Sequence, residues 1–196
     1  MQNYLLLPFV EIEIRLGTLG KTFDSSIDKK YFNEIKTNLQ NTQNIFSIET
    51  KQTTEYINKN IKLISKDKKE CLQMKENVLN KTFSLNNSPF DIRLSINQEF
   101  SLNSYINSFS KNENIIRKKD RTSFIDKNYR YDLTIVSESN NGITKQKYEI
   151  EIELLVNKET LTWSNDYLND FIECKIYDLI NVVEPIERES FKLKFF

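Results

Sequence analysis

Apolar and polar residues alternate with a period of two in several short stretches of the chain. Successive side chains of a β-strand point to opposite faces, so this period is typical of strands with one buried face. Asn140-Asn141-Gly142 supplies residue types that tolerate the positive φ of a tight hairpin turn. The pattern predicts a mainly antiparallel β protein, and the strands on either side of this turn should pair directly. The alternating stretches lie at residues 10–16, 45–57, 60–65, 90–100, 115–125, 129–137 and 147–156.

Two other segments place apolar residues at the spacing of an amphipathic helix. The first covers residues 25–40, with Ser25 or Ser26 as the expected N-cap. The second runs from Trp163 to about residue 183, with Ser164 as the expected N-cap. Both helices are expected to pack outside the sheet with their apolar stripes in the core. The stripes consist of Tyr31, Phe32, Ile35 and Leu39 in the first segment, and of Tyr167, Leu168, Phe171, Ile176, Leu179 and Ile180 in the second.

The organisation of the chain favours one unit. No repeat and no Pro- or Gly-rich linker interrupts it, so residues 1–196 are expected to form a single domain. Residues 191–196 alternate again, as in a final strand. Cys71 and Cys174 lie far apart without metal-ligand spacing, which favours a reducing intracellular compartment. No apolar stretch could span a bilayer and no signal peptide is recognisable, so we expect a soluble protein that is not secreted and has no membrane partner.

The composition excludes several kinds of chemistry. Histidine is absent, which rules out Ser-His-Asp and Cys-His catalysis and histidine metal ligands. There are only three glycines, and neither of the Gly-rich phosphate-binding spacings occurs. The 28 basic and 28 acidic residues balance, so any anion binding must come from a local cluster. Catalysis is therefore expected to depend on carboxylates and cations, with or without a metal ion.

Charged residues also alternate in the predicted strands. A single such strand is most often amphipathic, with a solvated charged face. Like charges about 7 Å apart on one face repel, however, unless cations or a metal compensate them. The acidic strands contain Glu11-x-Glu13-x-Arg15 and Glu149-x-Glu151-x-Glu153. The other polar faces carry Arg117, Lys119 and Arg121, then Arg130, Asp132 and Thr134, then Arg93, Ser95, Asn97 and Glu99.

The opposite faces of the acidic strands indicate how the charged faces are used. Ile12, Ile14, Ile150 and Ile152 are strongly apolar and must be buried, and the two helices can cover them. The charged faces then point inward, and a sheet closed into a barrel encloses a hydrophilic tunnel. Carboxylates on one wall with Arg and Lys on others can hold a divalent cation and a polyphosphate together.

In chain order, these motifs resemble those of the triphosphate tunnel metalloenzymes, specifically the metal-dependent RNA triphosphatases of fungal and large DNA virus mRNA capping systems. The resemblance covers most of the chain and implies a mainly β (α+β) fold, a closed antiparallel eight-stranded β-barrel with flanking helices. It also implies removal of the γ-phosphate from 5′-triphosphate RNA, which leaves a diphosphate end in the first step of capping. The motifs are Glu11-x-Glu13-x-Arg15, Asp91-Ile92-Arg93-Leu94-Ser95 with Glu99, Lys119-x-Arg121, Arg130-x-Asp132-x-Thr134 and Glu149-x-Glu151-x-Glu153.

The resemblance further implies a role for each residue. Glu99 and Glu151 are both candidates for positioning the attacking water, and Lys119 and Arg121 are expected to act in catalysis. Asp132 is expected to hold the cations in place, together with Thr134 and Glu149; for Asp132 and Glu149 a buried ion pair is the alternative. The expected ligands of Mg²⁺ or Mn²⁺ are Glu11, Glu13 and Glu153. The expected phosphate-binding residues are Arg15, Lys62, Arg93, Lys119, Arg121 and Arg130.

Two positions depart from the family pattern. The first motif often ends in Lys where this chain has Arg15, which keeps the charge but changes its geometry. The family also has a phosphate-binding arginine on a strand after the first helix. Lys62 is the nearest match, and a surface lysine is the alternative reading of that position.

Two other functions stay open at this point. One is hydrolysis of inorganic triphosphate or another small triphosphate by the same tunnel. The other is a noncatalytic barrel that binds anionic polymers or a partner protein. The chain has no Lys-x-Asp-Gly nucleotidyl-transfer motif, so a capping role would require a separate guanylyltransferase, in the nucleus or the cytoplasm, including that of a virus-infected host cell. The oligomeric state stays open.

Overall fold

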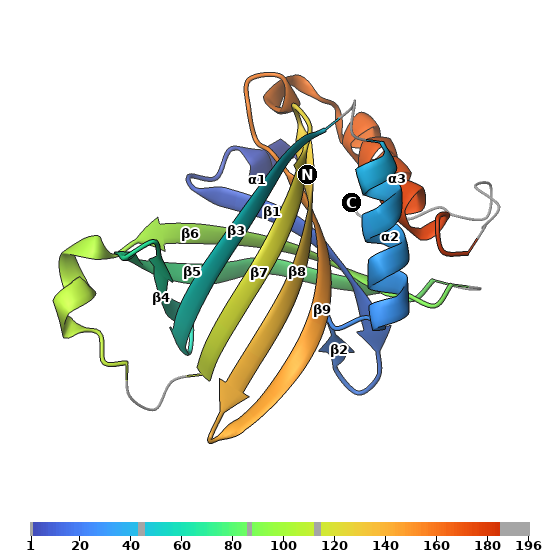
Figure 1. Cartoon of the computed structure of the whole chain (residues 1–196). Helices are drawn as coiled ribbons and strands as arrows, with labels where there is room; N and C mark the ends of the chain where they lie inside the picture. Colours follow the sequence, from blue (N-terminus) through green and yellow to red (C-terminus); the bar gives the residue numbers. More distant parts are fainter. Residues whose placement is uncertain (1, 43–45, 86–87, 112–114, 185–196) are drawn as a thin grey trace.

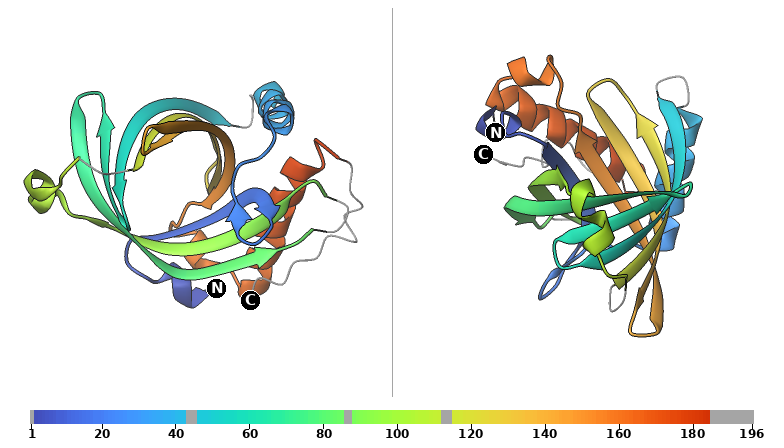
Figure 2. Two further views of the ribbon diagram at one scale, coloured as in Figure 1. Left: turned by 90° about the horizontal axis from the view of Figure 1, so that it is seen from below. Right: turned by 90° about the vertical axis from the view of Figure 1, so that its left-hand side faces the viewer.

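The protein is built on a closed β-barrel. The computed structural model describes residues 2–42, 46–85, 88–111 and 115–184. The sheet order is β2-β1-β6-β5-β4-β3-β7-β8-β9, and β1 also pairs with β9, so eight strands close while β2 extends β1 (Figure 1). Figure 2 (left) looks along the barrel. The strands are β1 Val10–Leu19, β2 Phe23–Asp24, β3 Ser47–Asn58, β4 Ile61–Lys66, β5 Lys69–Phe83, β6 Asp91–Ser101, β7 Ile115–Ile125, β8 Tyr129–Asn140 and β9 Ile143–Leu154.

Three α-helices and two short 3-10 helices accompany the described strands. They are α1 (Gln2–Leu5), α2 (Lys29–Asn41), α3 (Asn165–Ile180), η1 (Asn103–Ser108) and η2 (Thr160–Thr162). The helices α2 and α3 lie against the outside of the barrel, as expected from their apolar stripes (Figure 1). No helix in the described segments is long and apolar enough to cross a bilayer.

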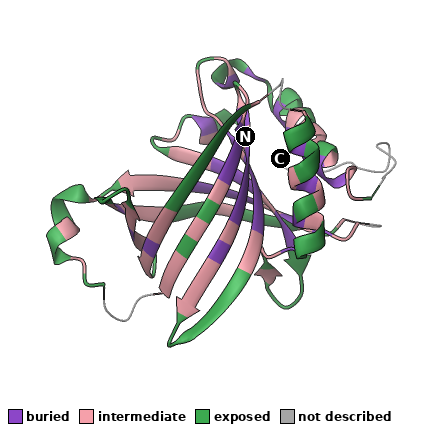
Figure 3. Ribbon diagram, viewed as in Figure 1, coloured by how far each residue is buried: buried purple, intermediate pink, exposed green. Residues whose placement is uncertain are grey.

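The hydrophobic core lies between the outer barrel face and these helices. Ile12 and Ile14 of β1 and Ile150 of β9 have almost no exposed surface, and Phe32 of α2 and Leu168 of α3 pack in the same cluster. Figure 3 shows the buried positions concentrated where the strands pass beneath the helices. The apolar faces of the acidic strands therefore point outward, because only there can they be covered.

All seven predicted strands that fall on described residues are present, and the predicted hairpin is confirmed. Asn141 (φ 49°) and Gly142 (φ 79°) have the positive φ values of a two-residue turn, and β8 and β9 pair along their length. The long strand β5 was missed. Its outward face carries polar residues such as Glu76, and a bulge between Asn77 and Leu79 shifts the alternation. The expected strand at residues 191–196 lies outside the described residues.

The N-cap prediction was correct for α3 and wrong for α2. The Ser164 hydroxyl accepts a hydrogen bond from the Tyr167 N–H, as a capping serine does. In α2 the cap is Asp28 instead of Ser25 or Ser26. Both serines bind β9: the Ser25 hydroxyl donates to Glu149, and the Ser26 hydroxyl accepts from the Tyr148 N–H.

Gly17 is expected to be required for the pairing of β2 with β1. A Cβ at this position would lie 2.1 Å from the Asp24 carbonyl oxygen and 2.6 Å from the Phe23 ring, so Gly17→Ala must displace β2. We expect a loss of about 1–3 kcal/mol in the free energy of unfolding, as for other overpacked sites. Urea denaturation measures this. Gly20→Ala is the matched control, because its Cβ would meet nothing closer than 3.9 Å; equal losses in both variants would contradict the prediction.

Candidate active site

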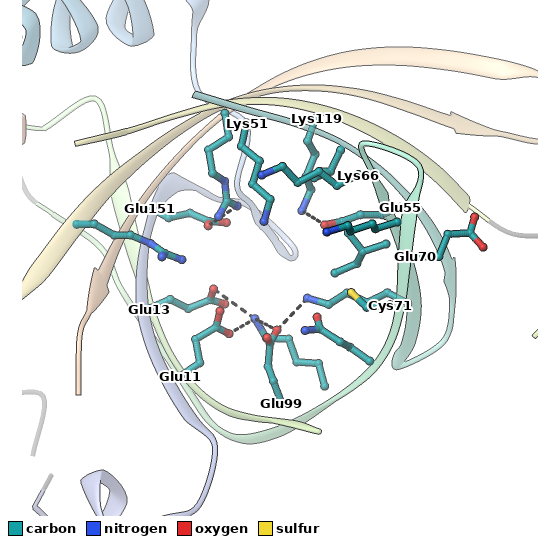
Figure 4. Close-up of a pocket in the computed structure, with 18 of the residues that line it drawn as sticks. Glu11, Glu13, Lys51, Glu55, Lys66, Glu70, Cys71, Glu99, Lys119 and Glu151 are labelled. Carbon is teal, nitrogen blue, oxygen red and sulfur yellow. Dashed lines mark hydrogen bonds and ion pairs between the residues drawn. The ribbon is translucent and has the colours of Figure 1, made fainter. Parts of the chain in front are cut away.

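The inward faces of the eight barrel strands enclose a cavity of about 500 Å³. Figure 4 shows carboxylates and ammonium groups projecting into it from opposite walls. This confirms the central structural expectation, that the charged faces converge on an enclosed bore and the isoleucines face outward. Of the predicted site residues, the cavity is lined by Glu11, Glu13, Arg15, Lys62, Glu99, Lys119, Arg121, Arg130 and Glu151.

Glu11 and Glu13 of β1 and Glu99 of β6 form an acidic wall around one lysine. The Lys75 ammonium forms an ion pair with Glu11 and lies 3.3 Å from Glu13 Oε2 and 3.8 Å from Glu99 Oε1. Burial, and next the charge of Glu13, raise the pKa of Glu11. Burial opposes the charge of Lys75, but Glu13 and Glu11 outweigh it and raise the pKa of this lysine. Clustered carboxylates thus depend on a cation here.

Sequence reasoning missed Lys75 and also Glu55, which is buried on β3. Glu55 accepts a hydrogen bond of 2.9 Å from Lys119, so Lys119 points into the bore from the neighbouring strand. Lys75 was missed with its whole strand. Its only signal was the short alternation of Cys71, Gln73 and Lys75 with the apolar Leu72 and Met74, which ends at Glu76.

Arg121 connects three strands of the opposite wall. Its guanidinium donates to Asp132 (2.7 Å), Thr134 (3.1 Å) and Glu151 (3.3 Å). Asp132 has no exposed surface and also accepts from Arg130 (3.1 Å), so it orients both arginines. Asp132 thus forms the buried ion pair that was the alternative for this position, and Thr134 contacts the same guanidinium of Arg121.

Glu151 and Glu153 of β9 differ in their surroundings. Burial acts to raise the pKa of Glu151, but Arg15, 2.7 Å away, and Arg121 lower it well below its ordinary value. Among the residues whose positions are described, Glu153 has Arg130 as its one ion-pair partner, at 2.6 Å. Burial, with a contribution from Glu11, raises the pKa of Glu153 to about 7 although Arg130 opposes this. The positive charge of Arg130 is therefore too little to offset the burial of the Glu153 carboxylate.

Arg93 and Glu149 lie beyond the cavity, at the end of the bore that β2 covers. The Arg93 guanidinium lies 4.7 Å from the centre of the Phe23 ring, and burial, with Arg15 next, lowers its pKa. Glu149 accepts hydrogen bonds from Arg117 (2.5 Å) and Ser25 (3.3 Å). Five of the predicted site residues do not line the cavity, although each belongs to an inward-facing strand surface. They are Arg93, Asp132, Thr134, Glu149 and Glu153.

The carboxylates have the chemistry that a hard divalent cation requires. Glu13 and Glu153 are direct partners across β1 and β9, and Glu11 lies two residues before Glu13 on the same face of β1. Their oxygens are the ligands that Mg²⁺ and Mn²⁺ prefer. In the described part of the chain no three such groups are close enough to hold a metal as they stand, because lysine and arginine side chains lie between them. These carboxylate oxygens fit a divalent ion, provided that the side chains of Lys75 and Arg130 move out from between them.

Replacing Lys75 with glutamine is expected to lower stability. Glu13 would stay buried with less compensating charge, which should lower the free energy of unfolding by about 2 kcal/mol. The loss is smaller than for a fully buried ion pair because Lys75 is partly exposed. The raised pKa of Lys75 shows that its charge favours folding, a contribution lost only far above neutral pH. In the variant, acid should protonate Glu11, whose pKa is raised, and reduce the loss. Urea denaturation at pH 7 and pH 5 tests this, with exposed Lys59→Gln as control; an equal loss at both pH values would contradict it.

Comparison with known proteins agrees with this geometry. A family model described as "mRNA capping enzyme, beta chain" matches residues 21–170, which begins after β1. The RNA triphosphatase Pct1 of S. pombe has a similar structure, with a TM-score of 0.75 and 18% identity over 91% of this chain and 88% of Pct1. A second Pct1 structure, in complex with the Spt5 CTD, gives a TM-score of 0.71 and 17% identity over the same shares of each chain.

A viral protein provides a further structural match. The Mimivirus capping enzyme triphosphatase has a TM-score of 0.62 and 16% identity, over 93% of this chain and 92% of the viral one. A comparison with the curated proteins finds no match. These solved structures support the fold, and the family model covers well over half of the sequence. The chain therefore belongs to the family of the mRNA capping enzyme beta chain.

Proposed function

We propose that this chain is a divalent-metal-dependent RNA 5′-triphosphatase, which removes the γ-phosphate of 5′-triphosphate RNA and leaves a 5′-diphosphate end as the first step of mRNA capping. The observation that carries the proposal is a closed barrel of the capping family whose cavity joins an acidic wall to a basic wall. An anionic polyphosphate requires the basic wall, and the carboxylates would repel it unless a metal lay between. Both walls are thus explained by one substrate.

Phosphate binding is assigned to five of the cations that line the bore. Arg121 and Lys119 reach it from β7, Arg15 from β1, Arg130 from β8 and Lys62 from β4. Their charges would neutralise the equatorial oxygens of the transferred phosphoryl group, where charge is concentrated in the transition state. Arg93 shares a register position with Arg15 but lies outside the cavity lining, so we assign it to the closed end of the bore, against Phe23, instead of to direct phosphate contact.

Glu99 is the better candidate for positioning the attacking water. Both oxygens of Glu151 are engaged, one by Arg15 and one by Arg121, and its lowered pKa makes it a poor proton acceptor. Burial acts against the charge of Glu99, but Lys62 and Lys75 lower its pKa, so it is also ionised. Both lysines approach its Oε1, however, which leaves Oε2 to accept a hydrogen bond from water. We assign to Glu151 the role of orienting Arg15 and Arg121.

Glu11, Glu13 and Glu153 are the proposed holders of Mg²⁺ or Mn²⁺. A bound divalent ion supplies charge neutralisation to the phosphate oxygens. Asp132, Thr134 and Glu149 hold the arginines in position by the hydrogen bonds described above. A separate guanylyltransferase would complete the capping reaction, and an intracellular site of action, in the nucleus or the cytoplasm, belongs to the same proposal.

The test compares two substrates. Triphosphate-ended RNA and inorganic tripolyphosphate are incubated with the chain and Mg²⁺ or Mn²⁺, and the RNA ends are analysed after digestion. We expect diphosphate-ended RNA with a higher kcat/KM than for tripolyphosphate. Hydrolysis of tripolyphosphate alone would favour an inorganic triphosphatase. No hydrolysis of either substrate would leave a noncatalytic anion-binding barrel.

A further inference from the structure

The exposure of the residues around the cavity locates its opening. In the described part of the chain, the exposed lining residues come only from the first half of β3 and from the β4–β5 hairpin. The barrel wall is incomplete there, because β3 pairs with β7 from Ser47 onward but with β4 only from Thr54. The cavity therefore meets solvent beside this hairpin. The exposed lining residues are Lys51, Lys66, Asp67, Lys69 and Glu70.

The three lysines of this opening, which we call the lysine mouth, carry an excess of positive charge. Lys51 and Lys69 form no ion pair with any carboxylate whose position is described. Lys66 lies 4.0 Å from Asp67, a pair too exposed to neutralise it. Glu70 is occupied elsewhere, because Lys111 donates to it at 2.6 Å. Lysines placed together without counter-charge repel one another, so this arrangement favours an anion.

The mouth continues the basic wall of the bore. Figure 4 shows Lys51 and Lys66 on the same side as Lys119, and Glu11, Glu13 and Glu99 on the opposite side. A polyphosphate in the bore would therefore meet positive charge along its whole path to solvent on this side.

The opposite end of the bore is filled by side chains. Arg117 bridges Glu149 and Glu138, at 2.5 and 3.3 Å, and Arg93 lies against Phe23 of β2. None of these residues borders the cavity. A substrate whose triphosphate enters the cavity must therefore leave the rest of its chain at the lysine mouth.

We propose that the lysine mouth binds the first phosphodiester groups of the RNA chain whose 5′-triphosphate occupies the cavity. This inference rests on the proposed function. Lysine ammonium groups act as point charges suited to backbone phosphates, and none of the described residues that line the opening is aromatic, so no base is stacked there. The mouth thus discriminates RNA from small triphosphates by chain length and without regard to base sequence.

The test is the triple substitution Lys51→Gln, Lys66→Gln and Lys69→Gln in the full chain. For a ten-nucleotide triphosphate RNA we expect KM to rise about tenfold with kcat within twofold, and the slope of log KM against log salt to fall by roughly two. For tripolyphosphate we expect a change in KM of less than twofold. Fluorescence anisotropy of the same RNA without metal is measured in parallel and should show binding about tenfold weaker. A matched control replaces Lys21, Lys29 and Lys145, which are exposed and distant from the opening, with glutamine.

Each outcome has a separate meaning. An equal rise of KM for both substrates would overturn the proposal, because the lysines would then bind the triphosphate itself. Unchanged RNA binding in the variant would overturn it whatever the activity, and so would an equal effect in the control. If the wild type hydrolyses neither substrate, the proposed function fails, and anisotropy alone then decides whether the mouth binds RNA. Binding of an acidic protein in competition with RNA, with no dependence on RNA length, would also contradict it.

Discussion

Glu11→Ala is expected to reduce phosphate release from triphosphate RNA by at least about 1,000-fold, which corresponds to roughly 4 kcal/mol of transition-state stabilisation. Glu11 is one of three carboxylates assigned to the metal, and its loss leaves two. Steady-state kinetics at saturating Mg²⁺ measures the effect. Glu76→Ala on β5 is the matched control, because Glu76 is exposed and lies on the outward face opposite Gln98.

The fold of this variant should be retained. The pKa of Glu11 is raised, so at neutral pH its ionised form is less stable in the folded chain than in the unfolded one, and removing it relieves repulsion from Glu13. We expect an unchanged or higher melting temperature. An inactive variant that melts well below the wild type would point to a structural role, and turnover within tenfold of wild type would refute the metal-site assignment.

Arg121→Lys is expected to lower kcat by about 100-fold while the chain stays folded. A lysine keeps the charge, but its donors all lie on one nitrogen and cannot reproduce the hydrogen bonds that three separate guanidinium nitrogens make to Asp132, Thr134 and Glu151. The cation would therefore be misplaced relative to the phosphate. Asp132 keeps its hydrogen bonds from Arg130 and Ser123, which limits the loss of stability. Single-turnover kinetics separates the loss in the chemical step from any change in binding.

The control for this substitution is Lys118→Arg, at an exposed position of β7 three residues before Arg121 that points away from the bore. It should leave kcat unchanged. Arg121→Lys with more than half of the wild-type kcat would show that only the charge matters, and would remove the reason for the three-strand network around the guanidinium.

Much of the fold could be predicted because one rule, the alternation of faces, determines it. Ile12 and Ile14 had to be buried, and Glu11 and Glu13 follow on the other face, so the burial of the isoleucines beneath the helices places the glutamates inside. The turn at Gly142 was predictable for a local reason, since few residues tolerate its positive φ.

Depth along the bore could not be predicted in the same way. Alternation shows on which face of a strand a residue lies. Its position along the barrel axis depends instead on strand tilt and on the register between strands distant in sequence. Glu149 and Glu151 share a face, yet Glu149 belongs to the closed end and Glu151 to the cavity. Lys75 was hidden for another reason, because the apolar alternation of Leu72 and Met74 on the other face of β5 ends at the exposed Glu76 and is then shifted by the bulge.

The most direct measurement is release of γ-labelled phosphate from triphosphate-ended RNA, with Mg²⁺ or Mn²⁺ and with a chelator in their place. If the acidic wall holds a divalent ion against a triphosphate bound by the basic wall, the label should be released with either metal and should fall to background in the chelator. Release that persists undiminished in the chelator, or no release with any divalent ion, would contradict the account.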